Sequence, residues 1–422
     1  MVDVWYSLYD RMLSRENLVK AFYKVRSSKG AAGIDGQSID DFAESFAPNI
    51  DHLLTELQDK SYQPLAVRRV EIPKRNGGKR QLGIPAVRDR VVQQALLDIL
   101  QPIFDRDFHP SSYGYRPGRS CHQAISKATM FIRTYERKWV VDMDLSKCFD
   151  TLNHDLILAS FRRRISDGSI LGLLEKFLKS GVLTGEGWQA SEVGSPQGGV
   201  ISPLIANVYL DSFDQFMKNR GHRIVRYADD ILILCQSKSA AENALNQASR
   251  YLEEELLLTI NQEKTHISHS LKGIKFLGVC IHSVMTRIQR GKVRSFKAKV
   301  KAMTRRNSPV NLEKVISDLN PLLRGFANYF RIANCKGEFS RLMGWIRRRL
   351  RAVQLKLWKK PSRLHRRLRQ LGYKGEFKSI KMNSWANAAS PLSHYALPNS
   401  CLHGEMGLFN LASVQTGISV SV

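Results

Sequence analysis

The spacing of apolar residues changes along the chain, and each change predicts a different kind of element. Apolar positions recur at helical spacing in Ser14–Lys29, Ser38–Lys60, Arg88–Phe104, Pro203–Lys218 and Ser239–Leu257, and a further helix is expected from about Ser146. Short apolar runs typical of strands occupy Val67–Pro73, Lys79–Ile84, Trp139–Asp144, Arg223–Tyr227 and Ile231–Cys235. The pattern predicts an α+β body in which long helices separate the strands.

The stretch from Met285 to Lys378 differs from this body in charge. It carries 27 Lys and Arg against four acids, which accounts for +23 of the formal net charge of +27 on the 422-residue chain. Its aromatic residues are interleaved with the bases. We therefore predict an all-helical basic domain that binds nucleic acid through phosphate contacts and base stacking. An anionic membrane surface is the alternative partner, but it would require a strongly apolar opposite face.

Composition also excludes several classes of protein. The six cysteines are scattered without a C-x-x-C pair, which argues against a zinc ribbon, a paired-cysteine endonuclease module and a disulfide scaffold. The sequence contains no run of about 18 apolar residues, so it predicts no transmembrane helix. Neither the P-loop nor the Rossmann glycine motif is present, so nucleotides would have to be bound in another way.

Three carboxylates are the candidate chemical groups. Asp229 and Asp230 lie in a turn between two apolar strands, and Asp144 ends an apolar strand just before a helix. Carboxylates in such positions repel one another unless a cation neutralises them. On neighbouring strand ends they could hold two Mg²⁺ ions, an arrangement used in phosphoryl transfer. For the 229/230 pair alone, a solvated hairpin turn is the alternative interpretation.

The motif Tyr227-Ala-Asp-Asp230, together with Asp144, resembles the palm of reverse transcriptases, and the resemblance continues in order along nearly the whole chain. The finger blocks of bacterial group II intron reverse transcriptases are similar to 33–36, 68–85 and 112–119. The template–nucleotide loop and the primer grip resemble 195–203 and 275–278, and the maturase region, or domain X, resembles 323–330 and 344–350.

This resemblance implies a right-hand polymerase: fingers and palm, with an antiparallel palm sheet, followed by a helical thumb. The N-terminal extension and first finger block would span 1–60, the fingers and palm 61–283, and the thumb or domain X 284–378. Residues 379–422 would form the short DNA-binding segment of the endonuclease-lacking type. Charge nearly vanishes there, so a disordered tail is the alternative.

The resemblance also assigns roles to single residues. The catalytic carboxylates would be Asp144, Asp229 and Asp230, and the metal ligands would be Asp144, Asp229 and the carbonyl of Leu145. The deoxynucleotide would contact Lys74, Arg80, Phe149 and Gln197. The candidate general acid is Lys264, and the primer grip would be Phe276, Leu277 and Gly278. RNA-binding residues of the thumb would be Arg324, Tyr329, Arg347, Arg348, Arg349 and Arg351.

Plainer interpretations stay open for several of these residues. Lys74 and Arg80 would also suit a solvated hairpin face, and Lys264 an ordinary surface position. Phe149 would act as a steric gate against the ribose 2′-OH, yet the same ring could be a helix core residue.

The implied activity is that of an RNA-directed DNA polymerase that extends a primer 3′-hydroxyl with dNTPs. It would use two Mg²⁺ ions, with Mn²⁺ as a substitute, and would assist splicing and mobility of its intron. Its partners would be group II intron RNA, an RNA template, a DNA or RNA primer and target DNA in the bacterial cytoplasm, with no membrane. The alternatives are a domesticated reverse transcriptase in DNA repair or phage defence, and a maturase acting mainly as an RNA-binding protein.

Overall fold

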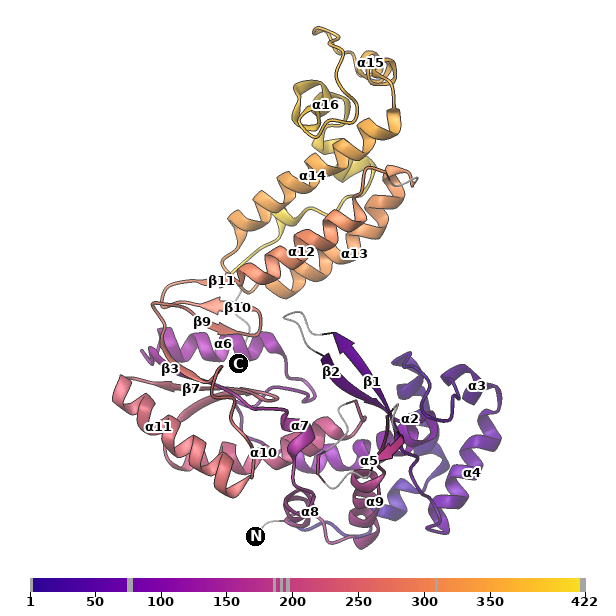
Figure 1. Cartoon of the computed structure of the whole chain (residues 1–422), viewed down its shortest axis with the longest axis vertical. Helices are drawn as coiled ribbons and strands as arrows, with labels where there is room; N and C mark the ends of the chain where they lie inside the picture. The colour runs from indigo at the N-terminus through magenta and orange to yellow at the C-terminus, as the bar shows by residue number, and fades with distance from the viewer. Residues whose placement is uncertain are drawn as a thin grey trace. The chain divides into compact units, whose positions relative to one another are not determined.

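The computed structural model describes residues 3–73, 79–184, 187–189, 193–194, 198–307 and 310–417, apart from the side chains of residues 80, 184, 187 and 188. It divides into two compact units, Met1–His269 and Ser270–Val422 (Figure 1). The sequence-based boundary at 283/284 therefore lies within the second unit.

Helices make up most of the first unit. They are α1 (Leu8–Met12), α2 (Arg15–Ser27), α3 (Ile39–Glu44), α4 (Phe46–Gln58), α5 (Val87–Asp105), α6 (Cys121–Arg133), α7 (Cys148–Thr151), α8 (His154–Arg162), α9 (Gly168–Lys179), α10 (Ser202–Asn219) and α11 (Lys238–Arg250), which a π-helical turn extends over Tyr251–Glu255. Several begin at capping residues. The Ser14 side chain accepts a hydrogen bond from the Asn17 amide, and Ser38 and Ser120 each form a capping box.

The central sheet of this unit is antiparallel and has the strand order β6–β7–β3–β8. Its strands are β3 (Trp139–Asp144), β6 (Arg223–Tyr227), β7 (Asp230–Cys235) and β8 (His266–His269). Alternate residues point to opposite faces. Val141, Met143, Ile231 and Ile233 are buried in the core of the unit, where α10 and α11 pack against the sheet (Figure 1).

A second, smaller sheet has the order β2–β1–β4–β5. Its strands are β1 (Val67–Pro73), β2 (Lys79–Ile84), β4 (Val182–Thr184) and β5 (Gly187–Gln189). The predicted strands β1 and β2 pair antiparallel, and β1 also pairs parallel with β4, which the sequence did not predict.

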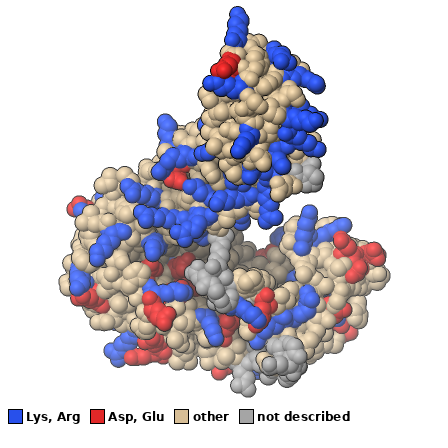
Figure 2. All heavy atoms as spheres, turned by 45° about the horizontal axis from the view of Figure 1, so that its top comes forward, with Lys and Arg blue, Asp and Glu red and all other residues tan. Residues whose placement is uncertain are grey.

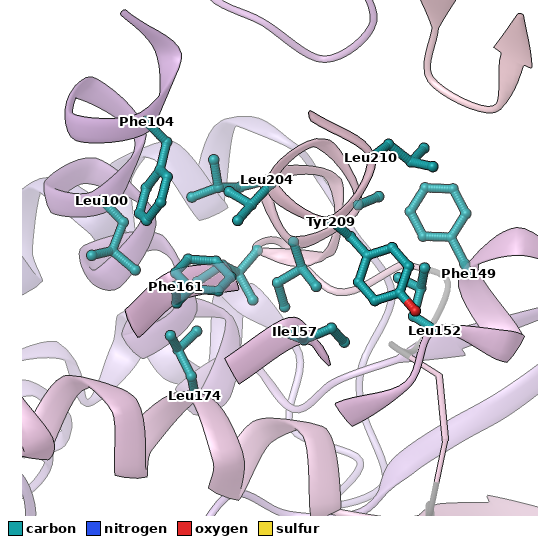
Figure 3. Packing of buried hydrophobic residues seen from close by; sticks show 14 of the residues in the cluster. Leu100, Phe104, Phe149, Leu152, Ile157, Phe161, Leu174, Leu204, Tyr209 and Leu210 are labelled. Carbon is teal, nitrogen blue, oxygen red and sulfur yellow. The ribbon is translucent and has the colours of Figure 1, made fainter. Parts of the chain in front are cut away.

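Buried aromatic and aliphatic side chains join the helices of the first unit into one core. In Figure 3, Phe161 of α8 lies near Leu100 and Phe104 of α5, while Tyr209 of α10 lies toward Leu152. The rings of Phe104 and Phe161 are 4.9 Å apart in an edge-on arrangement, a geometry that adds to the hydrophobic gain from burial.

The second unit begins with a small antiparallel sheet, β9 (Ile274–Phe276), β10 (Val279–Ile281) and β11 (Thr286–Ile288). Its helices are α12 (Arg290–Met303), α13 (Leu312–Phe330), α14 (Lys336–Trp358), α15 (Pro361–Gln370) and α16 (Pro391–Ala396), with short helical turns at Asn387–Ala389, Cys401–Glu405 and Leu411–Ser413. The basic domain is thus helical from Arg290. Strand β11 departs from the all-helical prediction because Thr286 and Ile288 are buried in its pairing with β10.

The described part of the tail, residues 379–417, packs against α14. Ala352 and Leu355 of α14 share a buried apolar cluster with Met382, Leu392 and Ala396. None of the described helices combines the length and apolar character needed to cross a membrane.

The close approach of two backbones at Gly114 yields a stability prediction. A Cβ atom at Gly114 would lie 2.3 Å from the backbone nitrogen of Ala228, in the turn between β6 and β7. We expect Gly114→Ala to destabilise the protein by about 1–3 kcal/mol, as overpacking does, measured by thermal unfolding of the full chain.

The matched control is Gly172→Ala in α9, where a Cβ atom would meet nothing within 4 Å. That change should stabilise the chain by about 0.4–1 kcal/mol through the unfolded state. Equal unfolding midpoints for the two variants would contradict the contact between Gly114 and the turn.

Candidate active site

Three carboxylates lie at one end of the central sheet. Asp144, the last residue of β3, is paired with Asp230, the first residue of β7. Asp230 is in turn paired with Tyr227 of β6, so Ala228 and Asp229 form the two-residue turn between these strands. Ala228 adopts a left-handed φ of 58°, which makes the turn tight. The predicted juxtaposition of Asp144 with the 229/230 pair is therefore present.

Negative charge accumulates at this sheet end. Asp230 reaches solvent on one side, but the surrounding protein removes water from the rest of its carboxylate. This desolvation, together with repulsion from Asp229, Asp142 and Asp144, raises the pKa of Asp230 to about 6. A carboxylate whose ionised form is disfavoured in this way would be stabilised by a bound cation.

In this structure a lysine supplies positive charge to one of the three. The Lys264 Nζ atom lies 2.7 Å from Asp144 Oδ2, and the Asn261 side-chain amide donates to the same oxygen at 3.1 Å. Two further hydrogen bonds join this segment to Asp144, because the Asn261 backbone amide donates to the Asp144 carbonyl and the side-chain Oγ1 of Thr265 accepts from the Asp144 amide. Lys264, which ordinary surface placement would also have explained, thus contacts a candidate catalytic carboxylate.

The carbonyl of Leu145 is not used by the neighbouring backbone pairing. Leu145 forms an isolated antiparallel bridge with Ile260. The two hydrogen bonds of this bridge run from Ser146 to Thr259 and from Asn261 to Asp144. The carbonyl oxygen of Leu145, next to Asp144 in the chain, therefore takes no part in the two hydrogen bonds of this bridge.

The donor chemistry of the site suits a hard divalent cation, because the candidate ligands are all oxygen atoms. Within the residues that the structure describes, no group of three or more His, Cys, Asp or Glu side chains converges as it would around a metal ion. Asp144 is turned to Lys264 instead. The residue types fit Mg²⁺, and in this structure Asp144 contacts Lys264.

A buried arginine fixes the turn that carries Asp229. Arg226 of β6 is fully buried, and its guanidinium donates to both oxygens of Asp214 on α10 at 2.6–2.9 Å. It also donates to Asn207 Oδ1 at 2.9 Å and to the carbonyl of Ala228 at 3.1 Å. One side chain thus joins β6, α10 and the turn.

The segment 111–116 lies along the other edge of β6. The Arg226 amide donates to the Ser111 carbonyl and the Tyr113 amide donates to the Arg226 carbonyl, both at 2.9 Å. The Asn207 side-chain amide donates to the carbonyl of Gly114 at 2.9 Å. This segment, which overlaps the finger block predicted at 112–119, therefore helps to support the acidic turn.

The candidate nucleotide-binding residues are only partly within the described structure. Lys74 and Gln197 lie outside the described residues, and the side chain of Arg80 on β2 is not described. Phe149 of α7 is 6% exposed, and its ring lies by Leu210 near Tyr209 in Figure 3. Phe149 is thus a core residue in α7, five positions after Asp144 at the end of β3.

The candidate primer-grip residues form the tight turn between β9 and β10. Phe276 is buried and pairs with Val279, and Leu277 and Gly278 both have positive φ, 43° and 82°. Two such residues between antiparallel strands match the right-handed twist of a hairpin. The Tyr329 hydroxyl donates to the Leu277 carbonyl at 2.8 Å, so α13 holds this turn in place.

Lys and Arg side chains cover much of the second unit in the view of Figure 2. Arg324 and Arg348 are exposed, and Arg347 and Arg349 are partly exposed. Arg351 differs, because it is 3% exposed and donates to the Leu397 carbonyl and to Asn399 Oδ1, both at 2.9 Å. In this structure Arg351 holds the tail on α14 and does not reach the surface predicted for it.

Sequence reasoning missed the residues that support the acidic turn. Asn207 and Asp214 are seven positions apart in α10, so they share a helix face that is otherwise apolar. Arg226 interrupts an apolar strand in the same way. Polar residues at core positions of two neighbouring elements are the signal that could have revealed a buried ion pair.

Two family models match the chain. The model "Reverse transcriptase (RNA-dependent DNA polymerase)" matches residues 72–281, and "Group II intron, maturase-specific domain" matches residues 293–372. Protein YkfC of Escherichia coli is 38% identical over 302 residues, which cover 62% of this chain and 79% of YkfC. The group II intron-encoded protein LtrA of Lactococcus lactis is 30% identical over 345 residues, 65% of this chain and 56% of LtrA.

A putative COX1/OXI3 intron 2 protein of Saccharomyces cerevisiae is 29% identical over 321 residues, 62% of this chain and 37% of that protein. The chain thus spans most of YkfC but little more than half of LtrA. The central sheet with its acidic turn and the two matched domains define an RNA-directed DNA polymerase joined to a maturase domain. The chain belongs to the group II intron reverse transcriptase/maturase family, which confirms the resemblance in its sequence.

The buried ion pair yields a second prediction. Replacing Arg226 by methionine would leave the carboxylate of Asp214 buried without its cation, so we expect a loss of about 3–5 kcal/mol in the free energy of unfolding. Urea unfolding of the full chain measures this loss.

Arg223→Met is the matched control, because Arg223 lies on the same strand but is exposed, and its removal should change stability by no more than about 0.5 kcal/mol. The double variant Arg226→Met/Asp214→Leu should recover much of the loss. Similar unfolding curves for Arg226→Met and Arg223→Met would show that the pair does not hold the turn.

Proposed function

We propose that this reverse transcriptase extends the 3′-hydroxyl of a DNA or RNA primer on an RNA template, with Mg²⁺ held by Asp144, Asp229 and the Leu145 carbonyl. The observation that carries the proposal is the pairing of Asp144 with Asp230 beside the turn that contains Asp229. Mn²⁺ has the same preference for oxygen ligands and would substitute. Two bound ions would supply a clamp on the attacking and leaving oxygens of the phosphoryl transfer.

The chain's own groups would divide the remaining tasks. Asp144 and Asp229 would present carboxylate oxygens from two strand ends that hydrogen bonding keeps rigid. Asp230, whose pKa is raised to about 6, would contribute charge without being a required ligand. Arg226 would act as a positioning residue, since its hydrogen bond to the Ala228 carbonyl holds the peptide preceding Asp229.

Lys264 would serve in turn as a counter-ion and as a proton donor. Before the cation binds, its ammonium group neutralises Asp144 at 2.7 Å. Once released from Asp144, the same group would be free to give a proton to the pyrophosphate leaving group, which is the role of a general acid. Its side chain is largely exposed, so it can move without repacking the core.

The incoming dNTP would be bound by residues on three segments. Lys74 and Arg80 would neutralise the triphosphate, and the backbone around Gln197 would approach the nascent base pair. Phe149 would exclude a ribose 2′-OH from its position directly after the Asp144 strand end. The turn formed by Leu277 and Gly278 would hold the primer terminus.

The maturase domain would bind intron RNA and assist splicing and mobility in the bacterial cytoplasm, with target DNA as the acceptor. The basic side chains of α13 and α14, including the exposed Arg324 and Arg348 and the partly exposed Arg347, support binding to phosphates. A domesticated role in DNA repair or phage defence would use the same polymerase site, so the maturase domain favours the intron role.

Primer extension on an RNA template, with dNTPs and Mg²⁺, measures the proposed activity. We expect Asp229→Ala to lower the extension rate about a thousandfold or more, since a metal-based contribution of several kcal/mol is lost. Splicing of the cognate intron RNA should survive in this variant, because RNA binding resides mainly in the other unit.

The matched control is Asp155→Ala on α8, an exposed carboxylate outside the site. It should leave extension within about twofold of the unmodified protein. Extension that persists in Asp229→Ala would refute the assignment of this turn to catalysis.

The gate role of Phe149 yields a separate prediction. Phe149→Val opens space beneath the sugar, so the ratio of ribonucleotide to deoxynucleotide incorporation should rise about tenfold or more. Single-nucleotide extension with paired rNTP and dNTP substrates measures this ratio.

Because Phe149 is also a core residue, the control must destabilise the core without touching the site. Phe161→Val serves, since Phe161 is fully buried on α8 against Phe104. It should lower stability while leaving the incorporation ratio unchanged. An equal ratio in both variants would mean that Phe149 is a packing residue only.

A further inference from the structure

An open cleft in the second unit is lined by none of the residues assigned above to the polymerase reaction. Its volume is about 620 Å³, within the range of roughly 300–1,000 Å³ typical of small-molecule sites. It is formed by the end of α12 and the following turn, by α14 and by the tail, and its lining includes Met303, Arg305, Arg306, Asn307, Arg349 and Trp385. No acidic side chain is among the described residues that line it.

The wall of the cleft is a stack of guanidinium groups and aromatic rings. The guanidinium carbons of Arg306 and Arg349 each lie 4.6 Å from the centre of the Trp385 ring. Arg349 also lies 5.4 Å from the ring of Trp345. Planar cations and indoles are the surfaces on which unpaired nucleobases stack.

This wall is held rigidly before any ligand binds. Arg349 donates from Nε to Thr304 Oγ1 at 2.6 Å and from Nη2 to the Thr304 carbonyl at 3.0 Å. The Trp385 carbonyl accepts from Arg348 at 3.2 Å, and the indole packs against the apolar cluster shared by α14 and the tail. A preorganised surface loses little conformational entropy on binding.

The positive charge of the cleft is not neutralised within it. The Arg306 Nη1 atom is buried and has no hydrogen-bond acceptor in the described structure. Burial, and after it the charge of Arg306, lowers the pKa of Arg349. An anionic acceptor bound at Arg305 and Arg306 would supply a hydrogen-bond acceptor and offset the positive charge of these side chains.

We propose that this cleft binds one unpaired nucleotide of an RNA strand, with its base stacked on the Arg306–Trp385–Arg349 wall and its phosphate on Arg305 and Arg306. The ring wall offers a stacking surface for a base, and the guanidinium groups offer donors for a phosphate. A peptide carboxylate or a free phosphate would leave the stacking surface unused. The choice of RNA rests on the maturase role proposed above. The cleft would hold a nucleotide extruded from the intron fold.

The test measures binding of a fluorescently labelled single-stranded RNA hexamer, and of the same hexamer with abasic residues, to the full chain in EDTA. The unmodified protein should bind the base-containing hexamer about tenfold more tightly, since stacking of one base on an aromatic and cationic surface adds to the affinity. Trp385→Leu keeps an apolar group against the cluster shared by α14 and the tail, and it should reduce this preference to within twofold. An unchanged preference in Trp385→Leu would overturn the proposal.

The phosphate contact has its own readout in the salt dependence of binding. Arg306→Ala should lower the slope of log affinity against log salt by about 0.7, the value for one phosphate contact on a single strand. Arg366→Ala removes one exposed charge from α15, outside the cleft, and should leave the base preference intact. If Arg306→Ala and Arg366→Ala lost the base preference equally, general electrostatic attraction would explain the binding. That result would overturn the proposed site.

Two further measurements compare DNA with RNA as the ligand and test whether binding in the cleft depends on the polymerase site. A DNA hexamer bound more tightly than RNA, with that advantage lost in Trp385→Leu, would overturn the assignment to RNA. Asp229→Ala should keep the base preference of the unmodified protein, because the measurement requires neither metal nor extension. Failure of primer extension and failure of the cleft are therefore distinguishable.

Discussion

The guanidinium of Arg226 is the interaction on which the geometry of the acidic turn depends. A fully buried cation is stable only when it is paired and its hydrogen-bonding groups are satisfied, and Arg226 meets this condition with Asp214, Asn207 and the Ala228 carbonyl. These partners come from α10 and from the turn itself. The turn that carries Asp229 is thus held by a charge pair behind the sheet, and the attraction and hydrogen bonds of that pair offset the cost of burying it.

The front of the sheet presents the opposite electrostatic condition. Asp142, Asp144, Asp229 and Asp230 accumulate negative charge, and the raised pKa of Asp230 expresses the resulting repulsion. Lys264 relieves part of it at Asp144. A cation that binds here must compete with an intramolecular ammonium group. The same lysine is thereby kept beside the reaction centre, where the proton it carries can be used after displacement.

Pattern and motif predicted the strands β3, β6 and β7 and the meeting of their acidic ends, because apolar runs and a two-residue turn dictate antiparallel pairing. They did not predict β8 or β4, which are short and mixed in polarity, so period-two alternation has too few positions to register. The contact of Lys264 with Asp144 joins residues 120 positions apart and follows from β8 pairing with β3. The buried role of Arg226 was missed for the same reason, since burial of an arginine depends on partners distant in sequence.

The basic domain shows why net charge alone overstates a binding surface. Arg351 donates its hydrogen bonds to the tail, and Arg349 donates to Thr304 and stacks on the Trp385 ring. Arg348 donates to the tail backbone and stays exposed. The tail carries few charges where it lies against α14, and Arg348 and Arg351 supply hydrogen-bond donors to two of its carbonyls and to Asn399. The tail, whose composition indicates weak binding to nucleic acid, therefore contributes to the cleft through Trp385. It places Trp385 among guanidinium groups, so that stacking and charge occur together at one cleft.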